Sequence, residues 1–316
     1  MMDIPTFANV VRENIGRVIL GKQAPIDLLL VALLCEGHIL LDDVPGTGKT
    51  MLARSLAVSL GGQFKRLQCT PDLMPNDVTG VSVFNQQTVT FEFHPGPIFV
   101  NELLVDEINR ATPRTQSALL EAMQEQQVSI EGVSRPLPRP FLVIATQNPV
   151  EYEGTFPLPE AQLDRFLMRL TMGYPTAGDE RRLLTHLQRE HPIHALQPVV
   201  QLSDLPALQR QVWEIHMDES LQGYLIQLTT ATRKHPDLAL GASPRASLAL
   251  FRAAQALAAV RGRDHVLPDD IQQLVIPVLN HRLIVAPSAD LRGRTARTVL
   301  QEIVARTPLD IGPLPT

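Results

Sequence analysis

The first half of the chain alternates short apolar runs with amphipathic segments, and this rhythm predicts strands and helices in turn. Alternating strands and helices are typical of a parallel sheet covered by helices on both faces, so we expect an α/β domain. The predicted strands are HILL (38–41), FKRLQC (64–69), ELLVD (102–106), FLVIAT (141–146) and FLMRLTM (166–172). The helices predicted between them include 49–60 and 113–126.

Two stretches interrupt this rhythm with a strict alternation of apolar and polar positions, which is the period of a strand. They are VSVFNQQTVTFEF (81–93) and VSIEGVSRPL (128–137). We predict that each forms a β-hairpin with a short polar turn. Both hairpins are insertions into the α/β scheme.

From about residue 178 onward, strand patterns fade and a period of 3.6 residues takes over, as in 179–190, 220–233, 243–263 and 268–283. Ser243 before Pro244, and Pro268 before Asp269, are typical of helix starts. The length of 316 residues is about twice that of a common domain. We therefore predict an α/β domain over 1–177 and a smaller, all-helical domain over 178–316.

The composition is that of a globular protein, with 44% apolar and 19% charged residues. The net charge of -5 gives no overall attraction to nucleic acid or to anionic membranes. Cys35 and Cys69 lie in apolar surroundings, and we expect buried free thiols in a reducing compartment. No apolar run approaches the roughly 20 residues that span a bilayer. Together with an N-terminus that lacks the pattern of a secretory signal, this predicts a cytoplasmic protein.

The stretch DDVPGTGKT (42–50) lies between a predicted strand and a predicted helix. Gly46 and Gly48 allow the backbone to curl, so that successive N–H groups form an anion site at the helix N-terminus. Lys49 would then reach the β- and γ-phosphates, and the Thr50 hydroxyl would hold Mg²⁺. The predicted phosphate-binding residues are Pro45, Gly46, Thr47, Gly48, Lys49, Thr50 and Met51.

Asp43 departs from the general phosphate-binding pattern G-x-x-x-x-G-K-[ST], because it occupies the position of the first glycine. A carboxylate beside phosphates is unfavourable, since like charges repel. We therefore expect the Asp43 side chain to point away from the phosphates or to be masked.

Polar groups also follow two other predicted strands. ELLVD ends in Asp106 and is followed by Glu107, where the first acid would hold Mg²⁺ and the second would polarise the attacking water. Asn148 follows FLVIAT, and its neutral amide could orient water against the γ-phosphate without adding charge. A turn residue before proline is the alternative reading of Asn148.

Two arginines complete the set of candidates. Arg165 lies near the end of a short predicted helix, where the helix dipole favours a cation in any case, so local physics leaves its role open. Arg245 lies in the first turn of a helix capped by Ser243, where the dipole disfavours a cation. This unfavourable placement suggests an anion nearby.

These motifs, in this order and followed by a helical domain, resemble the AAA+ ATPases and, in detail, the MoxR family. The resemblance covers nearly the whole chain, including VILGKQAPIDLLLVALLCEGHILLDDVPGTGKT, NELLVDEINRATPRTQSALLEAMQE, ATQNPVEYEGTFPLPEAQLDRF and GASPRA. Asp43 is also a familiar feature of that family.

The resemblance implies a role for each candidate. Lys49 and Thr50 would be the Walker A residues, Asp106 and Glu107 the Walker B residues, Asn148 sensor 1, Arg165 the arginine finger and Arg245 sensor 2. Val18, Ile19 and Gly21 would lie beside the adenine. The hairpin at 81–93 would be the helix-2 insertion, with its tip toward a central pore.

The resemblance further implies ATP and Mg²⁺ as cofactors and a ring of copies of this chain, usually a hexamer, in which Arg165 acts on the nucleotide of the next subunit. Members look like chaperones that mature protein clients or insert metal cofactors, often with a von Willebrand factor A domain protein.

Two alternative functions stay open from the sequence. A nucleic-acid motor of the helix-2-insert group could grip a strand with its hairpin, but 81–93 contains no lysine or arginine, which makes nucleic acid a disfavoured partner. A nucleotide-dependent switch with little turnover would need only the phosphate-binding turn. Glu107 argues against a switch, because binding alone does not require an acid that activates water.

Overall fold

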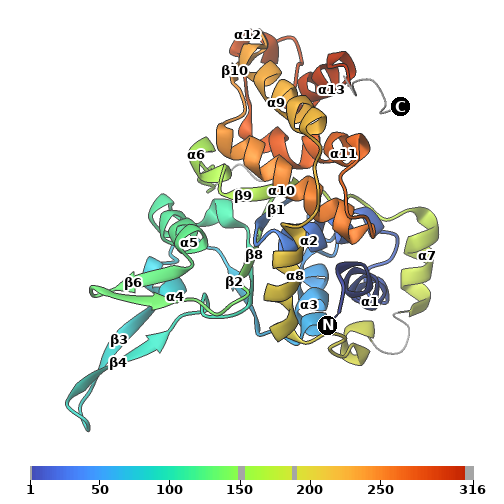
Figure 1. Cartoon of the computed structure of the whole chain (residues 1–316). Coiled ribbons are helices and arrows are strands. Elements are labelled where there is room, and N and C mark those ends of the chain that lie inside the picture. Colours follow the sequence, from blue (N-terminus) through green and yellow to red (C-terminus); the bar gives the residue numbers. More distant parts are fainter. Residues whose placement is uncertain (1, 149–153, 187–190, 310–316) are drawn as a thin grey trace.

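A computed structural model gives the structure of the chain for residues 2–148, 154–186 and 191–309. Its centre is a five-stranded sheet in the order β2-β5-β8-β1-β9, and every neighbouring pair is parallel (Figure 1). The strands are β1 (His38–Asp42), β2 (Phe64–Gln68), β5 (Glu102–Asp106), β8 (Leu142–Gln147) and β9 (Phe166–Leu170). All five predicted strands are confirmed, with ends shifted by at most two residues.

Helices cover both faces of this sheet because its inner strands are buried on both sides, as their continuous apolar runs predict. Ile39 and Leu41 face a core shared with α1, α2 and α3, whereas Leu40 between them faces a second core shared with α5. Figure 1 shows the two groups of helices on opposite sides of the strands. The helices are α1 (Ile4–Gly16), α2 (Gln23–Leu34), α3 (Lys49–Leu60) and α5 (Pro113–Glu125).

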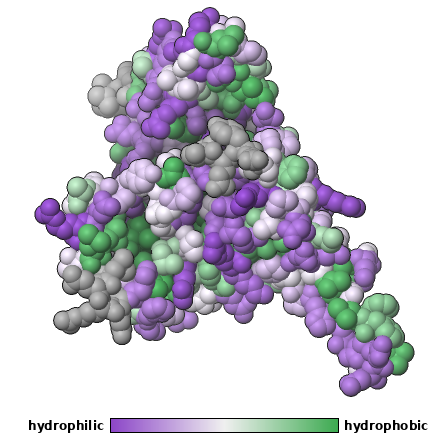
Figure 2. Space-filling model, turned by 180° about the vertical axis from the view of Figure 1, so that it is seen from behind, coloured by the Kyte–Doolittle hydropathy of each residue, from purple (hydrophilic) through white to green (hydrophobic). Residues whose placement is uncertain are grey.

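Both predicted hairpins are present, and they extend away from the sheet (Figure 1). The first, preceded by the short helix α4 (Pro75–Thr79), consists of β3 (Gly80–Asn85) and β4 (Thr90–Pro95). The second consists of β6 (Gln127–Ile130) and β7 (Val133–Pro136). The free end of the first hairpin carries exposed apolar side chains, and Figure 2 shows them as a hydrophobic patch on the projecting arm.

The C-terminal part is helical, as expected, and packs above the sheet through α10 against α1 and α2. Its helices are α9 (Glu219–Lys234), α10 (Pro244–Val260), α11 (Pro268–Leu279), α12 (Pro287–Asp290) and α13 (Ala296–Arg306). Ser243 caps α10 by accepting a hydrogen bond from the Ala246 N–H at 3.2 Å. We refer to residues 219–306 as the lid. The lid also contains a small antiparallel sheet, which the sequence did not predict, of β10 (Leu238–Leu240) and β11 (Ile284–Val285).

The remaining helices and turns lie in the chain between the elements already described. They are α6 (Glu160–Leu163), α7 (Ala177–His186), α8 (Leu205–Val212) and the 3-10 turns η1 (Ile108–Arg110), η2 (Pro192–Ala195), η3 (Leu202–Asp204) and η4 (Asn280–Arg282). Residues 187–190 of the predicted 179–190 helix, and the tail from 310, lie outside the described residues. The division at 177/178 stays a prediction. No helix in the described parts of the chain is both long and apolar enough to cross a membrane.

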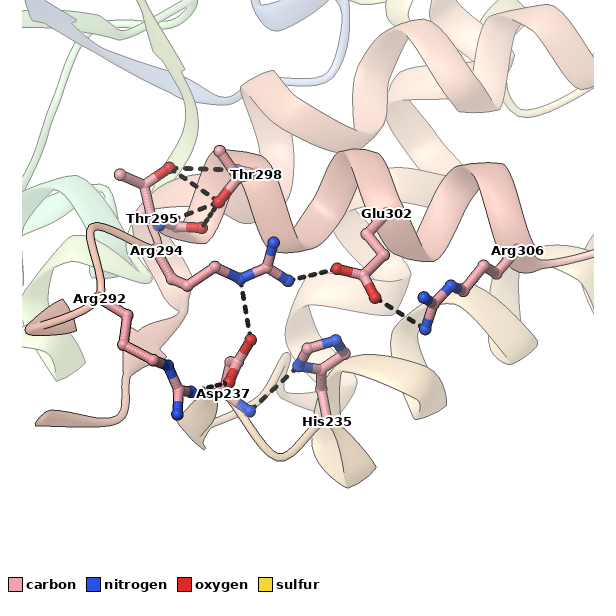
Figure 3. A network of polar contacts seen from close by, with 8 residues as sticks. All are labelled: His235, Asp237, Arg292, Arg294, Thr295, Thr298, Glu302 and Arg306. Atoms are coloured by element: carbon pink, nitrogen blue, oxygen red, sulfur yellow. Dashed lines mark hydrogen bonds and ion pairs between the residues drawn. The ribbon is translucent and has the colours of Figure 1, made fainter. Parts of the chain in front are cut away.

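A chain of ion pairs lies at the end of the lid farthest from the sheet. Asp237 pairs with Arg292 at 2.7 Å and with Arg294 at 2.9 Å, and Glu302 on α13 pairs with Arg294 and Arg306 (Figure 3). These pairs tie the segment before β10 to the loop before α13. Because Arg292 and Arg306 are well exposed, solvent screens their share of the network.

Candidate functional site

The turn between β1 and α3 has the backbone that an anion site requires. Gly46 and Gly48 have φ angles of 84° and 89°, which are in the left-handed region that favours glycine. A Cβ atom on Gly46 would meet no atom within 4 Å, so this glycine borders open space. Residues 46–48 lead directly into α3, which begins at Lys49. The predicted cradle at a helix N-terminus is therefore formed.

Lys49 lies across the base of this turn. Its Nζ donates hydrogen bonds to the backbone oxygens of Asp43 at 2.6 Å and Val44 at 3.3 Å. Anionic phosphate oxygens form stronger bonds with an ammonium than neutral carbonyls do, so these oxygens are replaceable partners. The Thr47 hydroxyl donates to the same Val44 oxygen at 3.3 Å.

The buried Asp43 side chain, which departs from the general phosphate-binding pattern, bonds to two backbone N–H groups. Its side chain is buried, with 5% exposure, and its carboxylate accepts the Val44 N–H at 2.9 Å and the Gly173 N–H at 2.7 Å. The carboxylate therefore faces the segment after β9. This agrees with our expectation that the Asp43 side chain points away from the phosphates or is masked. Lys22, which sequence reasoning missed, holds that segment through the oxygens of residues 172, 173 and 174.

The ends of β5 and β8 bring the predicted acids to the same edge of the sheet. Asp106 accepts the Thr146 hydroxyl at 2.6 Å, and the Thr146 oxygen accepts the Glu107 N–H at 2.9 Å. Glu107 has a φ of 56°, so the chain turns sharply at this residue. Since Thr146 bonds to the Asp106 carboxylate and to the Glu107 backbone, the two strand ends hold one another in place.

Three further polar residues contact these acids, and none was predicted from the sequence. Arg66 in the middle of β2 donates to Asp106 through Nε at 3.0 Å and Nη2 at 2.7 Å. Gln68 and Arg110 both donate to Glu107 Oε2, at 2.9 and 3.1 Å. Arg66 and Gln68 alternate on one face of a strand, which was the signal available in the sequence.

Two adjoining hollows gather most of the predicted residues. The polar hollow is lined by Pro45, Gly46, Gly48, Lys49, Thr50, Met51, Arg66, Asp106, Glu107, Thr146 and Asn148. The more apolar hollow is lined by Arg17, Val18, Ile19, Leu20, Lys22, Gly46, Thr47, Gly48, Met51, Pro175, Leu183, His191 and Pro192. They share Gly46, Gly48 and Met51, so one elongated ligand could occupy both.

The side-chain oxygen atoms in the polar hollow are suitable ligands for a hydrated Mg²⁺ that binds together with a phosphate. Such an ion takes one or two protein oxygens and keeps water and phosphate as its other ligands. Thr50 and Asp106 line the same hollow and offer a hydroxyl and a carboxylate. Within the described residues, no group of three or more His, Cys, Asp or Glu side chains could form a separate metal site.

The remaining candidates fall in different places. Gly21, with a φ of 69°, does not line the apolar hollow. A Cβ atom on Gly21 would lie 2.1 Å from Asp179 Oδ2, so the lack of a side chain allows Asp179 to pack closely against the backbone of Gly21. Arg165, just after α6, and Arg245, on the exposed first turn of α10, line neither hollow. Both cysteines are free thiols, and burial raises the pKa of Cys69 to about 12, so this thiol stays protonated.

Two family models match the two parts of the chain. The model described as the ATPase family associated with various cellular activities matches residues 38–168, and the AAA lid domain model matches residues 230–303. The first range contains all five strands of the sheet, and the second covers most of the lid. Fold and site together define a AAA ATPase.

Individual relatives narrow this class. Chaperone MoxR1 of Mycobacterium tuberculosis is 42% identical, over 99% of this chain and 83% of its own length. The uncharacterised protein YeaC of Bacillus subtilis is 51% identical over 95% and 93%. A Cytophaga hutchinsonii protein described as a candidate ATPase has a solved structure with a TM-score of 0.88 and 38% identity, covering 96% of each chain. The chain belongs to the MoxR family of AAA+ ATPases.

Proposed function

We propose that the chain hydrolyses MgATP in a closed ring of its own copies and uses this cycle to remodel protein clients. The observation that carries the proposal is the polar hollow, where Lys49, Thr50, Asp106 and Glu107 meet at the ends of a helix and a strand. The apolar hollow beside it, lined by Val18 and Ile19, supports binding of the adenine there. Gly21 shapes the loop that leads into this hollow.

In the proposed reaction, Lys49 exchanges its bonds with the Asp43 and Val44 oxygens for bonds with phosphate oxygens. Thr50 and Asp106 would hold Mg²⁺, which would supply positive charge beside the β- and γ-phosphates. Glu107 accepts a hydrogen bond from a water through Oε1, while Oε2 stays with its two donors. As the water oxygen bonds to the γ-phosphorus, its proton passes to Glu107 Oε1. The bond to the bridging oxygen breaks, and its electron pair stays on that oxygen to leave ADP and phosphate.

Three residues act around this centre in the proposal. Asn148, which is buried and lines the hollow, orients the γ-phosphate and the water. Arg165 reaches the nucleotide of the next subunit as an arginine finger, since it lines neither of the two hollows described above. Arg245 contacts phosphate when the lid closes. A hexamer is the ring that the family resemblance suggests.

The first hairpin supports a protein client over a nucleic acid. Val83, Phe84, Val89 and Phe91 are between 46% and 73% exposed near its free end (Figure 2). Residues 80–95 contain no lysine or arginine to pair with phosphates. A relative that is named a chaperone agrees with this choice. Insertion of a metal cofactor into the client, with a von Willebrand factor A domain protein as partner, is the narrowest form of the proposal.

Calorimetry with MgATP, together with phosphate release, tests the proposal. Lys49→Ala should weaken binding by about ten- to a hundredfold, because an ammonium bonded to phosphate is lost. Lys65→Ala is the matched control, since Lys65 is exposed on β2. Hydrolysis per subunit should rise with protein concentration as rings assemble. Absence of heat with millimolar MgATP for the folded wild-type protein would overturn the proposal.

A further inference from the structure

Arg282 is a buried cation at the junction between the lid and the sheet. It ends the turn η4 after α11, and η4 contacts both α6 and β9. Its side chain is only 3% exposed. Burial lowers the pKa of Arg282 to about 10, so the guanidinium is still charged at neutral pH. A buried charge is costly unless it is well paired, so its partners are informative.

Those partners surround one residue of the candidate hydrolysis machinery. Arg282 Nη2 donates to the backbone oxygens of Asp164 at 3.3 Å and Phe166 at 2.8 Å. Arg282 Nε also forms an ion pair with Asp164 Oδ1 at 2.7 Å. The residue between Asp164 and Phe166 is Arg165. One lid side chain therefore holds the backbone on both sides of Arg165.

Two neighbouring contacts strengthen this junction. His281 Nε2 lies 3.1 Å from the same Phe166 oxygen, so two consecutive lid side chains converge on the start of β9. The Ser243 hydroxyl donates to Asp164 Oδ2 at 3.4 Å. Ser243 is the cap of the helix that carries Arg245. Asp164 therefore connects the segment that contains Arg165 with two parts of the lid, the start of α10 at Ser243 and the turn η4 at Arg282.

We propose that Arg282 is a positioning residue that sets the orientation of Arg165 according to the position of the lid. The proposal rests on the action of Arg165 across a subunit boundary. A planar guanidinium with several bonds transmits a displacement to all of its partners, because its donors have fixed directions. When one subunit's lid moves on its own nucleotide, residues 164–166 follow, and hydrolysis at the neighbouring subunit's site changes.

The test mixes two variants that are each nearly inactive. Arg282→Gln has an intact nucleotide site but a displaced Arg165, and we expect about 10²-fold slower hydrolysis with unchanged MgATP affinity by calorimetry. Glu107→Gln has an inactive site but an intact Arg165. In a random one-to-one mixture, an Arg282→Gln site beside a Glu107→Gln subunit regains hydrolysis. The mixture should reach about a quarter of the wild-type rate, since each site takes one neighbour.

Arg165→Ala mixed with Glu107→Gln is the parallel experiment, and it separates this inference from the proposed function. Recovery in that mixture but none with Arg282→Gln would overturn the role of Arg282 alone. Recovery in neither mixture would remove action between subunits, and the role of Arg282 with it. Wild-type hydrolysis by Arg282→Gln alone would also overturn the role.

Two further variants keep the test decisive if Arg282→Gln folds poorly. Arg282→Lys retains the charge, but a single ammonium cannot reproduce the fixed directions of the donors on Nε and Nη2, so this variant should show a smaller loss and the same recovery on mixing. Arg263→Gln is the stability control, because Arg263 pairs with the buried Asp270 elsewhere in the lid. Arg263→Gln should hydrolyse MgATP like the wild type. A loss in Arg263→Gln equal to that in Arg282→Lys would overturn the assignment.

Discussion

The two ends of the candidate site are built in different ways. At the phosphate end, Lys49, Asp106 and Glu107 lie where one helix begins and one strand ends. Thr146 there bonds to the Asp106 carboxylate and to the Glu107 backbone N–H. At the arginine end, Arg165 follows a four-residue helix and lines neither hollow. A single chain thus fixes the groups proposed to bind nucleotide. The group proposed to speed hydrolysis depends on the lid and on a neighbour.

The strongest test of this difference is Arg165→Ala. Arginine fingers contribute about 10³- to 10⁵-fold to phosphoryl transfer, so we expect at least a 10³-fold loss of the hydrolysis rate. MgATP affinity measured by calorimetry should stay unchanged, because the phosphate end is intact. Arg181→Ala, at an exposed position on α7, is the control. Wild-type hydrolysis by the Arg165 variant would remove the finger assignment.

Glu107→Gln removes the proposed general base at the phosphate end. It should therefore slow hydrolysis but leave MgATP binding intact. Loss of a general base reduces rates by about 10²- to 10⁴-fold, and phosphate release should fall by that factor. The glutamine still accepts a hydrogen bond, so MgATP should bind and stabilise rings detectable by sedimentation. Glu125→Gln, exposed at the end of α5, should behave like wild type. Loss of binding in Glu107→Gln would instead indicate a structural role.

Asp43→Asn tests how firmly the turn at the phosphate end is held by the Asp43 carboxylate. The amide keeps one acceptor oxygen and loses the other, so either the Val44 or the Gly173 N–H is left without its acceptor. An unsatisfied buried N–H costs about 1 to 3 kcal/mol, and urea unfolding should report a loss of this size. MgATP affinity should fall modestly, because the turn is less firmly held. An unchanged unfolding midpoint would contradict the role of Asp43 as an anchor.

Arg294→Gln is expected to have the smallest effect. It breaks the ion pairs with Asp237 and Glu302 at the far end of the lid (Figure 3). These side chains are between 15% and 31% exposed. Ion pairs that water and salt can reach contribute little. Hydrolysis should match the wild type, and the urea midpoint should scarcely move at moderate salt. A large loss of hydrolysis would mean that this network, and not only Arg282, couples the lid to the site.

Much of the fold could be predicted because its signals are local. The inner strands are continuous apolar runs, which few other elements resemble. The helix predicted over 49–60 has those bounds in the structure, because Gly48 and Gly61 border it in left-handed conformations. The small sheet of β10 and β11 was missed because strands of three and two residues show no period.

The candidate site could be predicted only where its residues lie together in short stretches of sequence, such as DDVPGTGKT and ELLVDE. Lys49, Thr50, Asp106 and Glu107 follow strands and were found in this way. Arg66, Gln68 and Lys22 act through partners 39 to 152 residues away, and only the packed chain brings them together. Gly21 was predicted to lie beside the adenine, but it does not line the apolar hollow. The absence of a side chain at Gly21 instead allows close packing against Asp179, a tertiary neighbour that the sequence does not reveal.

The apolar core on one side of the sheet runs without interruption from Ile39 in β1 through Leu250 in α10 to Val299 in α13. Sheet and lid are therefore expected to melt as one cooperative unit. A ligand held only at the β1–α3 turn would then protect helices that it never touches. At a free concentration one hundred times its dissociation constant, this protection amounts to about 2.7 kcal/mol, shared by the whole chain.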